Sequence, residues 1–522
     1  MPASVLDWRR HWLKPIFFLA LIAMGLFALV YWLDHRAAGQ LSINALERYV
    51  ALDGDYLTDA ISQLAPVTIA MFGIVVTVVA IIVQLAAGRY TGVVRMFLRD
   101  RVNAMALSFY VVLGVFGIWL SVGLQEGFVP RLALMAGMAG ASLGLLLMLP
   151  YFGYVFWFLE PTNLVNRICR SAAQTVRRAT TCKVGSRLHA LQRQTLEAMA
   201  ELTDIASHSI SGKDKIIASR AVDAFRDFTI DYLAAKPRLP DAWFSIGPEI
   251  RGNPDFVAMN SESLGDLEAR HTWVEWQVLR QYLGIYTEAL SHMPDIDYLI
   301  AIDSRYIGEA AAERADDALV DLILCFYNSY LRATLNARSV RTAYNVLNQY
   351  RLLVEGLLRL GSSRHALDGA RFMSYYGHVG YDLHLPFVTE TVAYDLSSLC
   401  QVAHALGSGE EDGILSHFLE LDRPLRAKQQ ERALLGVRKA QIKLAVYYLS
   451  VGEIARATSI ATDMKDEPKE RIATLRLELE RATSKDFWEI TDRGRNFEYM
   501  PPPQRARLAE YFELLATQAG TA

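Results

Sequence analysis

The chain has 522 residues, which is too long for one compact core and predicts at least two structural units. Its 53 basic and 56 acidic residues leave a formal net charge of −3, so nothing in the charge suggests a nucleic-acid partner. The cysteines have neither zinc-ligand nor CxxC spacing, and we expect each to be a buried, reduced thiol. They are Cys169, Cys182, Cys325 and Cys400.

Four apolar runs in the first third of the chain are long enough to cross a bilayer as helices, which takes about 20 residues. We place them at residues 15–33, 61–88, 104–124 and 131–158. The first run is longer than the apolar region of a signal peptide, and no small-residue cleavage site follows it. Residues 1–159 are therefore predicted to form a four-helix transmembrane domain.

Basic residues alternate between the short loops that join these runs. Cations gather before the first run (Arg9, Arg10), between the second and third runs, and after the fourth (Arg167, Arg170), whereas the other two loops hold few. Cytoplasmic loops carry the excess of Lys and Arg. The alternation therefore predicts that both termini are cytoplasmic.

The second run carries a stripe of small and polar residues on an otherwise apolar helix. Its members recur at steps of three and four, so they share one helical face. They are Asp59, Gln63, Pro66, Ala70, Gly73, Thr77, Ala80, Gln84 and Ala87. Lipid favours Val, Ile and Phe, so this face is expected to contact protein or water. Two interpretations stay open: the stripe lines a pore, or it packs against a helix within the monomer or at a subunit contact.

A basic segment joins the second and third runs. Arg89, Arg95, Arg99 and Arg101 alternate there with apolar residues. This pattern predicts an amphipathic elbow on the cytoplasmic leaflet, with its arginines reaching lipid phosphates. The alternative is a solvated cytoplasmic loop.

Two stretches match motifs of a known family. The first runs from Gly73 through Gln84 and Tyr90 to Asp100. The second is a cytoplasmic motif that includes Asp204, Ile205, Ala206, Ser211 and Asp214. Together they resemble the domain-of-unknown-function 2254 family of bacterial predicted membrane proteins, over roughly residues 60–230. The resemblance implies a bacterial inner-membrane protein with a four-span core, and it implies no activity.

Beyond the membrane domain the periodicity is helical almost throughout. Residues 160–235 are predicted as a helical juxtamembrane segment, and the Pro- and Gly-containing residues 236–265 as a loop or linker. Residues 266–522 hold helix-length runs separated by short turns, which predicts helical hairpins in a solenoid. The fold class is thus all-α: a four-span transmembrane bundle followed by a large, solenoid-like cytoplasmic domain.

Ligand-type residues gather closely at one place, His378, Asp382 and His384. They are weak candidates for a metal site, because two histidines six positions apart point to different faces of a helix and need a loop. Gly377 and Gly380 permit such a loop. A packed or surface loop without a metal is the interpretation we favour. Since no nucleotide-binding, hydrolase or zinc-protease motif is present, we predict no enzyme activity and no cofactor.

Two functions from different classes fit these observations. The first is a homo-oligomeric ion channel or permeation pathway in the inner membrane, lined by the second span and regulated by the cytoplasmic helices. The alternative is a membrane-anchored scaffold or sensor that binds protein partners through its helical repeats. It is suggested by residues 160–522, which are far more than a pore needs. Either way the expected partners are the lipid bilayer and protein, either further copies of the chain or another protein.

Overall fold

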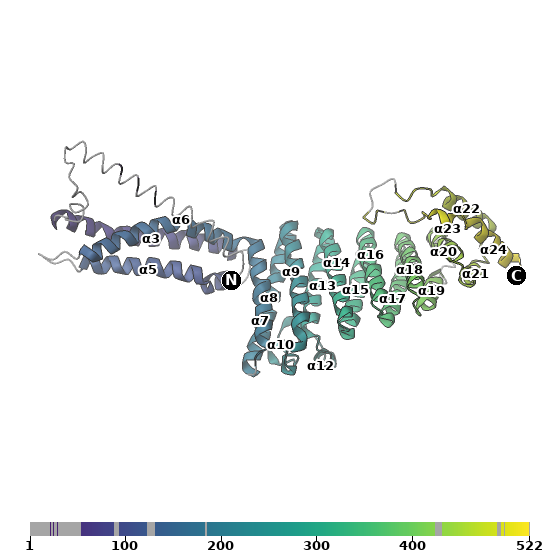
Figure 1. Ribbon diagram of the computed structural model, residues 1–522, viewed down its shortest axis with the longest axis horizontal. Coiled ribbons are helices and arrows are strands. Elements are labelled where there is room, and N and C mark those ends of the chain that lie inside the picture. The colour runs from purple at the N-terminus through teal and green to yellow at the C-terminus, as the bar shows by residue number, and fades with distance from the viewer. Residues whose placement is uncertain are drawn as a thin grey trace. The chain divides into compact units, whose positions relative to one another are not determined.

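The computed structural model describes residues 54–87, 93–122, 131–182, 185–422, 431–487, 492–494 and 496–520, together with Leu21, Gly25 and Leu29. Within these residues every regular element is a helix, which confirms the all-α class (Figure 1). The chain divides into two compact units, Met1–Leu164 and Val165–Ala522.

The first unit contains the long helices α3 (Gly54–Ala87), α5 (Arg101–Val122) and α6 (Arg131–Leu159), with the short α4 (Val93–Arg99) between α3 and α5. Among the described residues, three segments are long and apolar enough to cross a membrane: Ala65–Ala87, Arg101–Val122 and Ala133–Leu159. They correspond to the second, third and fourth predicted spans. The first predicted span, residues 15–33, lies outside the described residues except for the three isolated positions given above, which are helical.

Small residues let these three helices approach closely. A Cβ added to Gly117 on α5 would lie 2.9 Å from Thr68 Oγ1 of α3, and one added to Gly140 on α6 would lie 2.8 Å from Leu113 Cδ1 of α5. Tyr110 also donates a hydrogen bond of 2.8 Å to the carbonyl oxygen of Gly144. Close backbone approach substitutes for the hydrophobic drive that is missing between helices in lipid.

The second unit begins with α7 (Pro161–Ala179), α8 (Gly185–Ser211) and α9 (Lys215–Ala235). Residues 236–265, predicted as a loop or linker, instead form short helical turns that are packed into this unit. Their centre is the fully buried Trp243, whose ring lies 5.5 Å from that of Trp273. The turns are η1 (Lys236–Arg238), η2 (Asp241–Trp243), α10 (Pro248–Arg251) and α11 (Pro254–Val257), followed by α12 (Ser261–Ala269).

Helices of 20 or 21 residues, and the shorter α19, then follow one another along the chain. They are α13 (Trp273–His292), α14 (Pro294–Glu313), α15 (Asp317–Asn336), α16 (Val340–Arg359), α17 (Ser363–Asp382), α18 (Pro386–Leu406), α19 (Glu411–Leu419) with η3 (Glu420–Asp422), and α20 (Glu431–Val451). The C-terminal part contains α21 (Ile454–Asp463), α22 (Lys469–Arg481), α23 (Pro502–Arg505) and α24 (Leu508–Gly520).

These helices stack in two layers, which we call the helical array (Figure 1). Helices α9, α14, α16, α18 and α20 contact one another in succession and form the first layer. The second layer is formed in the same way by α8, α13, α15, α17 and α19. Each helix therefore buries its apolar face against its neighbours in sequence, as stacked helical hairpins do.

Candidate functional site

Helix α3 packs with one face and exposes the opposite one. Its buried side chains include Thr68, Met71, Val75 and Val79, which face α5 and α6. The predicted stripe lies about 180° away at 3.6 residues per turn. Its members Gln63, Pro66, Ala70, Gly73, Thr77, Ala80 and Gln84 are all exposed, and Ala87 is half-buried. The side chain of Asp59 lies outside the described part.

The geometry at Gly73 supports this assignment. A Cβ at that position would have no atom within 4 Å. The small residues of the stripe are therefore not required for packing among α3, α5 and α6. The stripe therefore makes no close contact with α5 or α6, and both interpretations, a pore lining and packing against another helix, are kept as proposals.

The predicted basic elbow is the short helix α4 and the start of α5. Arg95, Arg99 and Arg101 are exposed, whereas Arg89 lies outside the described residues. On the buried side, the Phe97 ring meets that of Phe158 edge-on at 5.7 Å. The break between the helices is held by Asp100, whose Oδ2 accepts hydrogen bonds from the Val102 amide at 3.1 Å and from Tyr154 Oη at 2.6 Å.

The family-like cytoplasmic motif forms the corner between α8 and α9. Ile205 and Ala206 are buried, whereas Asp204 lies on the same helix and is half-buried. Ser211 ends α8, and its Oγ donates to Glu288 Oε1 at 3.2 Å. Asp214 caps α9 by accepting a 3.1 Å hydrogen bond from the Ile217 amide. The structure thus brings the motif together as a helix corner whose visible contacts are structural.

The candidate metal residues do not converge. His378 and Asp382 lie inside α17, and His384 follows its end. The loop that a metal site required is absent there, because Gly377 and Gly380 are helical and pack against α18 and η3. A Cβ at Gly377 would lie 2.6 Å from Leu421 Cδ1. Nowhere in the described residues do three His, Cys, Asp or Glu side chains form a group that could hold a metal ion.

The cysteines only partly follow expectation. Cys400 is buried, but Cys169 and Cys182 are half-buried and Cys325 is exposed. Burial raises the pKa of the Cys169 thiol to about 11, so this side chain is a thiol rather than a thiolate at neutral pH.

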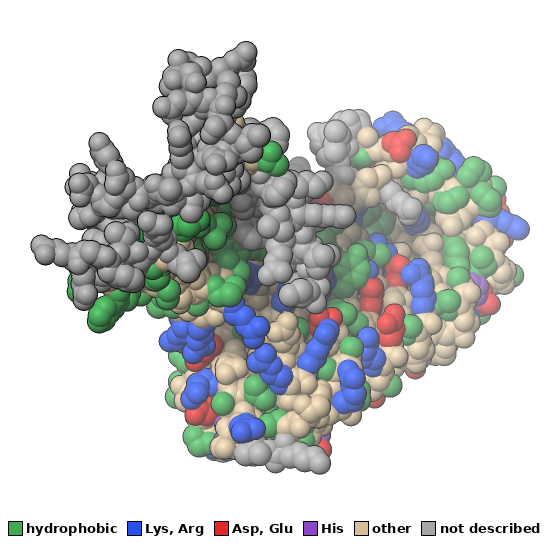
Figure 2. Space-filling model, turned by 60° about the vertical axis from the view of Figure 1, so that its left-hand side comes forward, with side chains coloured by type: hydrophobic (Ala, Val, Ile, Leu, Met, Phe, Trp, Pro, Cys, Tyr) green, Lys and Arg blue, Asp and Glu red, His purple; other side chains and the backbone are tan. Residues whose placement is uncertain are grey.

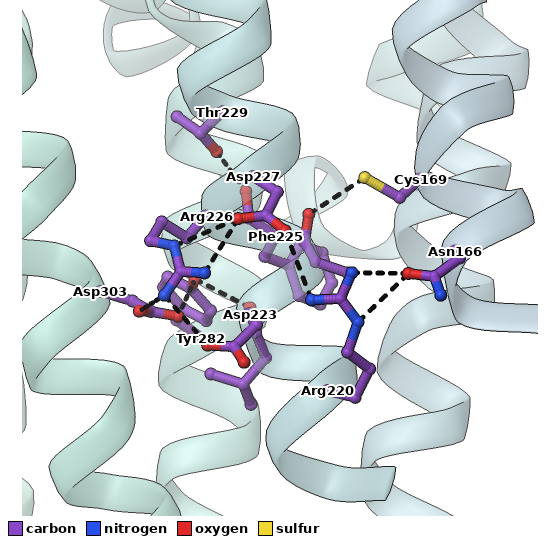
Figure 3. A network of polar contacts seen from close by, with 12 residues as sticks. Asn166, Cys169, Arg220, Asp223, Phe225, Arg226, Asp227, Thr229, Tyr282 and Asp303 are labelled. Carbon is purple, nitrogen blue, oxygen red and sulfur yellow. Dashed lines mark hydrogen bonds and ion pairs between the residues drawn. The ribbon is translucent and has the colours of Figure 1, made fainter. Parts of the chain in front are cut away.

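A polar network that the sequence did not reveal joins α7, α9, α13 and α14 (Figure 3). Arg226 on α9 bonds Asp303 on α14 at 2.8 Å, and the Asp303 side chain is fully buried. Burial raises the pKa of Asp303 to about 7, although the Arg226 charge opposes that rise. Nearer the start of α9, Arg220 Nε donates to Asn166 Oδ1 on α7 at 3.1 Å.

A second unpredicted site is a cavity of about 930 Å³ on the free side of the first layer of the helical array. Helices α16, α18 and α20 form one wall, and Lys485, Asp486 and described residues from 492–494 and 496–504 form the other. Its polar lining includes Arg351, Glu355, Asp395, Lys443 and Arg493. No sequence signal marked it, because Arg493 and its partner Asp395 are 98 positions apart.

Helix α7 has a markedly basic exposed surface. Its exposed side chains include Arg170, Arg177 and Arg178, and the helix contains no acidic residue. Figure 2 looks onto this end of the second unit and shows Lys and Arg side chains gathered there. A basic helix directly after a membrane span is typical of the cytoplasmic side of a membrane.

Comparison with known proteins gives one relationship. The model of the family described as Predicted membrane protein (DUF2254) matches residues 8–218. This confirms the family resemblance seen in the sequence. We call the matched residues 8–218 the DUF2254-like region. It contains the three described spans and the α8–α9 corner, and it ends before most of the helical array. No curated protein and no solved structure matches the chain significantly.

Proposed function

We propose that this protein is a membrane-anchored scaffold or sensor whose helical array binds a protein partner. The observation that carries the proposal is the two-layered stacking of α8 to α20. It gives the first layer a long outer face that, within the described residues, the chain itself crosses only at α16, α18 and α20. Stacked helical repeats bind partners along such faces. The charged side chains Arg351, Glu355, Asp395 and Arg493 in the cavity lining are ion-paired with one another. Paired charges suit a binding surface better than a catalytic site, so we further propose that the protein is not an enzyme.

The proposal includes a location. The DUF2254-like region anchors the chain in the bacterial inner membrane, and the array lies in the cytoplasm together with both termini. This orientation is supported by the exposed arginines of α4 and α7, which suit an anionic cytoplasmic leaflet.

Site-specific photocrosslinking in intact cells tests the binding function. A photoreactive residue is placed at Asn348 or Gln401, which line the cavity on the outer face of the first layer. Matched controls carry it at Arg332 or Arg371, which are exposed on α15 and α17 of the second layer. We expect adducts with a second protein from the first pair only. Equal labelling from both pairs, or no adduct from either, contradicts the proposal.

The exposed stripe of α3 favours a second candidate, a homo-oligomeric ion channel or permeation pathway. Copies arranged around a common axis would turn Thr77 and Gln84 toward a water-filled path, because no other described helix covers this face. A closed ring of copies in nanodiscs is required for this function, and a monomer contradicts it.

Cysteine accessibility tests the pathway in a chain whose four native cysteines are replaced by alanine. Cysteine at Thr77, Ala80 or Gln84 should react with a charged thiol reagent, whereas cysteine at the fully buried Val75 should not. Thr77→Leu or Gln84→Leu should reduce ion flux into liposomes, since alkyl groups favour dewetting of a narrow lumen. If the stripe cysteines do not react and no ion flux is measured, we would assign the stripe to contacts between copies of the chain. Ala80→Leu should then weaken those contacts.

A further inference from the structure

The free face of the first layer is crossed by a segment of the chain itself. Asp492 Oδ2 accepts hydrogen bonds from Arg341 and Asn345 on α16, at 3.2 and 2.9 Å. Farther along, Lys443 on α20 donates to the Phe497 carbonyl oxygen at 2.6 Å. The segment therefore passes across α16, α18 and α20 in succession, in the way that a bound peptide follows a repeat array.

Arg493 is the deepest anchor of this segment. Its side chain is only 6% exposed. The guanidinium donates two hydrogen bonds to Asp395 on α18, at 2.6 and 3.2 Å, and one to the Tyr344 carbonyl at 2.5 Å. It also lies 4.2 Å from the centre of the Tyr344 ring. The Asp395 carboxylate accepts from the planar donors of the guanidinium, and the Tyr344 ring provides a cation–π contact. Both are contacts that arginine makes better than lysine does.

Phe497 is the second anchor, four positions after Arg493. Its ring stacks on Tyr394 with centroids 4.8 Å apart and meets Tyr344 edge-on at 5.9 Å. The next residue, Glu498, pairs with Lys439 of α20 at 2.6 Å. The two anchors share Tyr344, so α16 and α18 together form one receptor for an arginine and an aromatic side chain.

The fit of the segment is incomplete. The cavity of about 930 Å³ remains between the segment and the helices. Among the described residues, three buried polar atoms in its lining have no hydrogen-bond partner: Arg493 Nε, Tyr394 Oη and Gln504 Oε1. Unmade hydrogen bonds of buried groups are costly. Of these three atoms only Tyr394 Oη belongs to the receptor helices, so an occupant that bonded it and left no donor of its own unpaired would bind more tightly than this segment does.

We infer that the face of α16, α18 and α20 is a peptide-binding groove, here occupied by the chain's own Asp492–Gly494 and Asn496–Glu498. The partner it fits presents an arginine followed four positions later by an aromatic residue, with acidic groups beside them that meet Arg341 and Lys439. This inference rests on the proposed scaffold function and specifies the chemistry of the partner. Binding in trans requires release of the chain's own segment.

Peptide binding to the full-length protein in nanodiscs tests the inference. The probe is a fluorescent peptide that copies residues 490–500. The double variant Arg493→Ala/Phe497→Ala removes both internal anchors and should bind the probe at least 10-fold more tightly than the unmodified chain, because competition within the chain is lost. Replacing the arginine of the probe by alanine should abolish the gain.

Further variants separate groove binding from a general structural effect. Lys443→Ala, added to the double variant, should weaken probe binding several-fold, since Lys443 can no longer donate to the probe carbonyl that corresponds to that of Phe497. Arg507→Ala, which removes an exposed ion pair with Glu510 outside the groove, should leave the affinity of the unmodified chain unchanged. Arg493→Lys retains the charge without the paired donors and should give an affinity between those of the unmodified and double-variant chains.

Two results overturn the inference: a double variant that binds no more tightly than the unmodified chain, or a probe whose arginine is dispensable. Circular dichroism establishes that each variant is folded, and the Arg493→Lys chain provides the comparison if the double variant is not. If the peptide experiment fails but the first-layer positions still give photocrosslinks in cells, the scaffold function is retained and the partner binds in another way. Probe binding without any photocrosslink in cells would instead retain the groove and contradict the scaffold function.

Discussion

Asp297 is a fully buried carboxylic acid on α14, and neither of its oxygens has a hydrogen-bond partner among the described residues. Burial raises its pKa to about 8, because the charged form loses hydration and gains nothing in return. The group is therefore protonated at neutral pH, close to the buried hydroxyl of Tyr286, whose pKa is raised mainly by burial and further by the Asp297 charge.

Asp297→Asn should remove a pH dependence of stability. Between about pH 4 and pH 8 the unfolded carboxyl is ionised while the folded one is protonated, so the folded state binds more protons. The free energy of unfolding should therefore fall as the pH rises through this window and then level off. We define the difference as the free energy of unfolding of Asp297→Asn minus that of the unmodified chain. This difference should increase by a few kcal/mol between pH 4 and pH 8, as measured by urea unfolding in detergent.

Asp295→Asn is the matched control, since Asp295 lies on the same helix in an exposed pair with Lys215. Its difference from the unmodified chain should stay small throughout. A constant difference between Asp297→Asn and the unmodified chain from pH 4 to pH 8 would contradict the raised pKa.

Arg226→Met should destabilise the array at pH 8, because it leaves Asp303 buried without its cation. Loss of one partner from a buried ion pair costs about 3–5 kcal/mol. The loss should shrink below pH 6, where protonation neutralises Asp303, whose pKa is already about 7 in the intact pair. Chemical unfolding at pH 5 and pH 8 measures both effects.

Arg193→Met provides the comparison, because Arg193 and Glu249 form a largely exposed pair at 3.3 Å. Such a pair contributes about 0–1 kcal/mol. Equal losses for the two variants would mean that burial of Asp303 in the network of Figure 3 adds nothing to the free energy of its ion pair.

At the scale of the helix, α17 shows how glycine serves contact between elements. A Cβ at Gly377 would lie 2.6 Å from Leu421 Cδ1 and 3.1 Å from Val392 Cγ1. Gly377→Ala should therefore destabilise the protein by about 1–3 kcal/mol through overpacking, although alanine favours the helix itself. The change in thermal unfolding temperature measures the outcome.

Gly284→Ala on α13 is the matched substitution without a neighbour. A Cβ at Gly284 would meet nothing within 4 Å, so only helix propensity changes. This variant should be stabilised by about 0.5–1 kcal/mol. If both substitutions stabilise the protein, α17 and its neighbours are not closely packed at Gly377.

At the scale of the whole molecule, the topology is a prediction from charge. Four spans with cytoplasmic termini require that a periplasm-active reporter be silent when fused after Ala522 and active when inserted near Asp53. The physical reason is that loops rich in Lys and Arg stay on the cytoplasmic side. Reporter activity in cells measures the result, and the reverse pattern would place the array and its groove outside the cytoplasm.

The helices themselves were largely predictable, because an apolar repeat of 3.6 residues is a local property of the chain. The three described spans lie close to the ranges that the period predicts, and the region beyond them is helical as predicted, although the helical turns of residues 236–265 and the helix that contains Gly377 and Gly380 were not predicted. The error at Gly377 and Gly380 has a local cause as well. In a sequence, glycine is usually taken to indicate a loop. Its use for close contact between helices depends on a neighbouring helix that cannot be identified from the local sequence.

The sequence by itself determined the membrane location, the helical class and the existence of a distinct face on α3. Only the tertiary structure decided that this face points away from α5 and α6, because a helical period defines a face but not what covers it. The same holds for the charged sites. Arg226 and Asp303 are 77 positions apart, and Arg493 and Asp395 are 98 apart. Such partners meet only when the stacked layers bring distant helices together, so local sequence patterns could not predict these pairs.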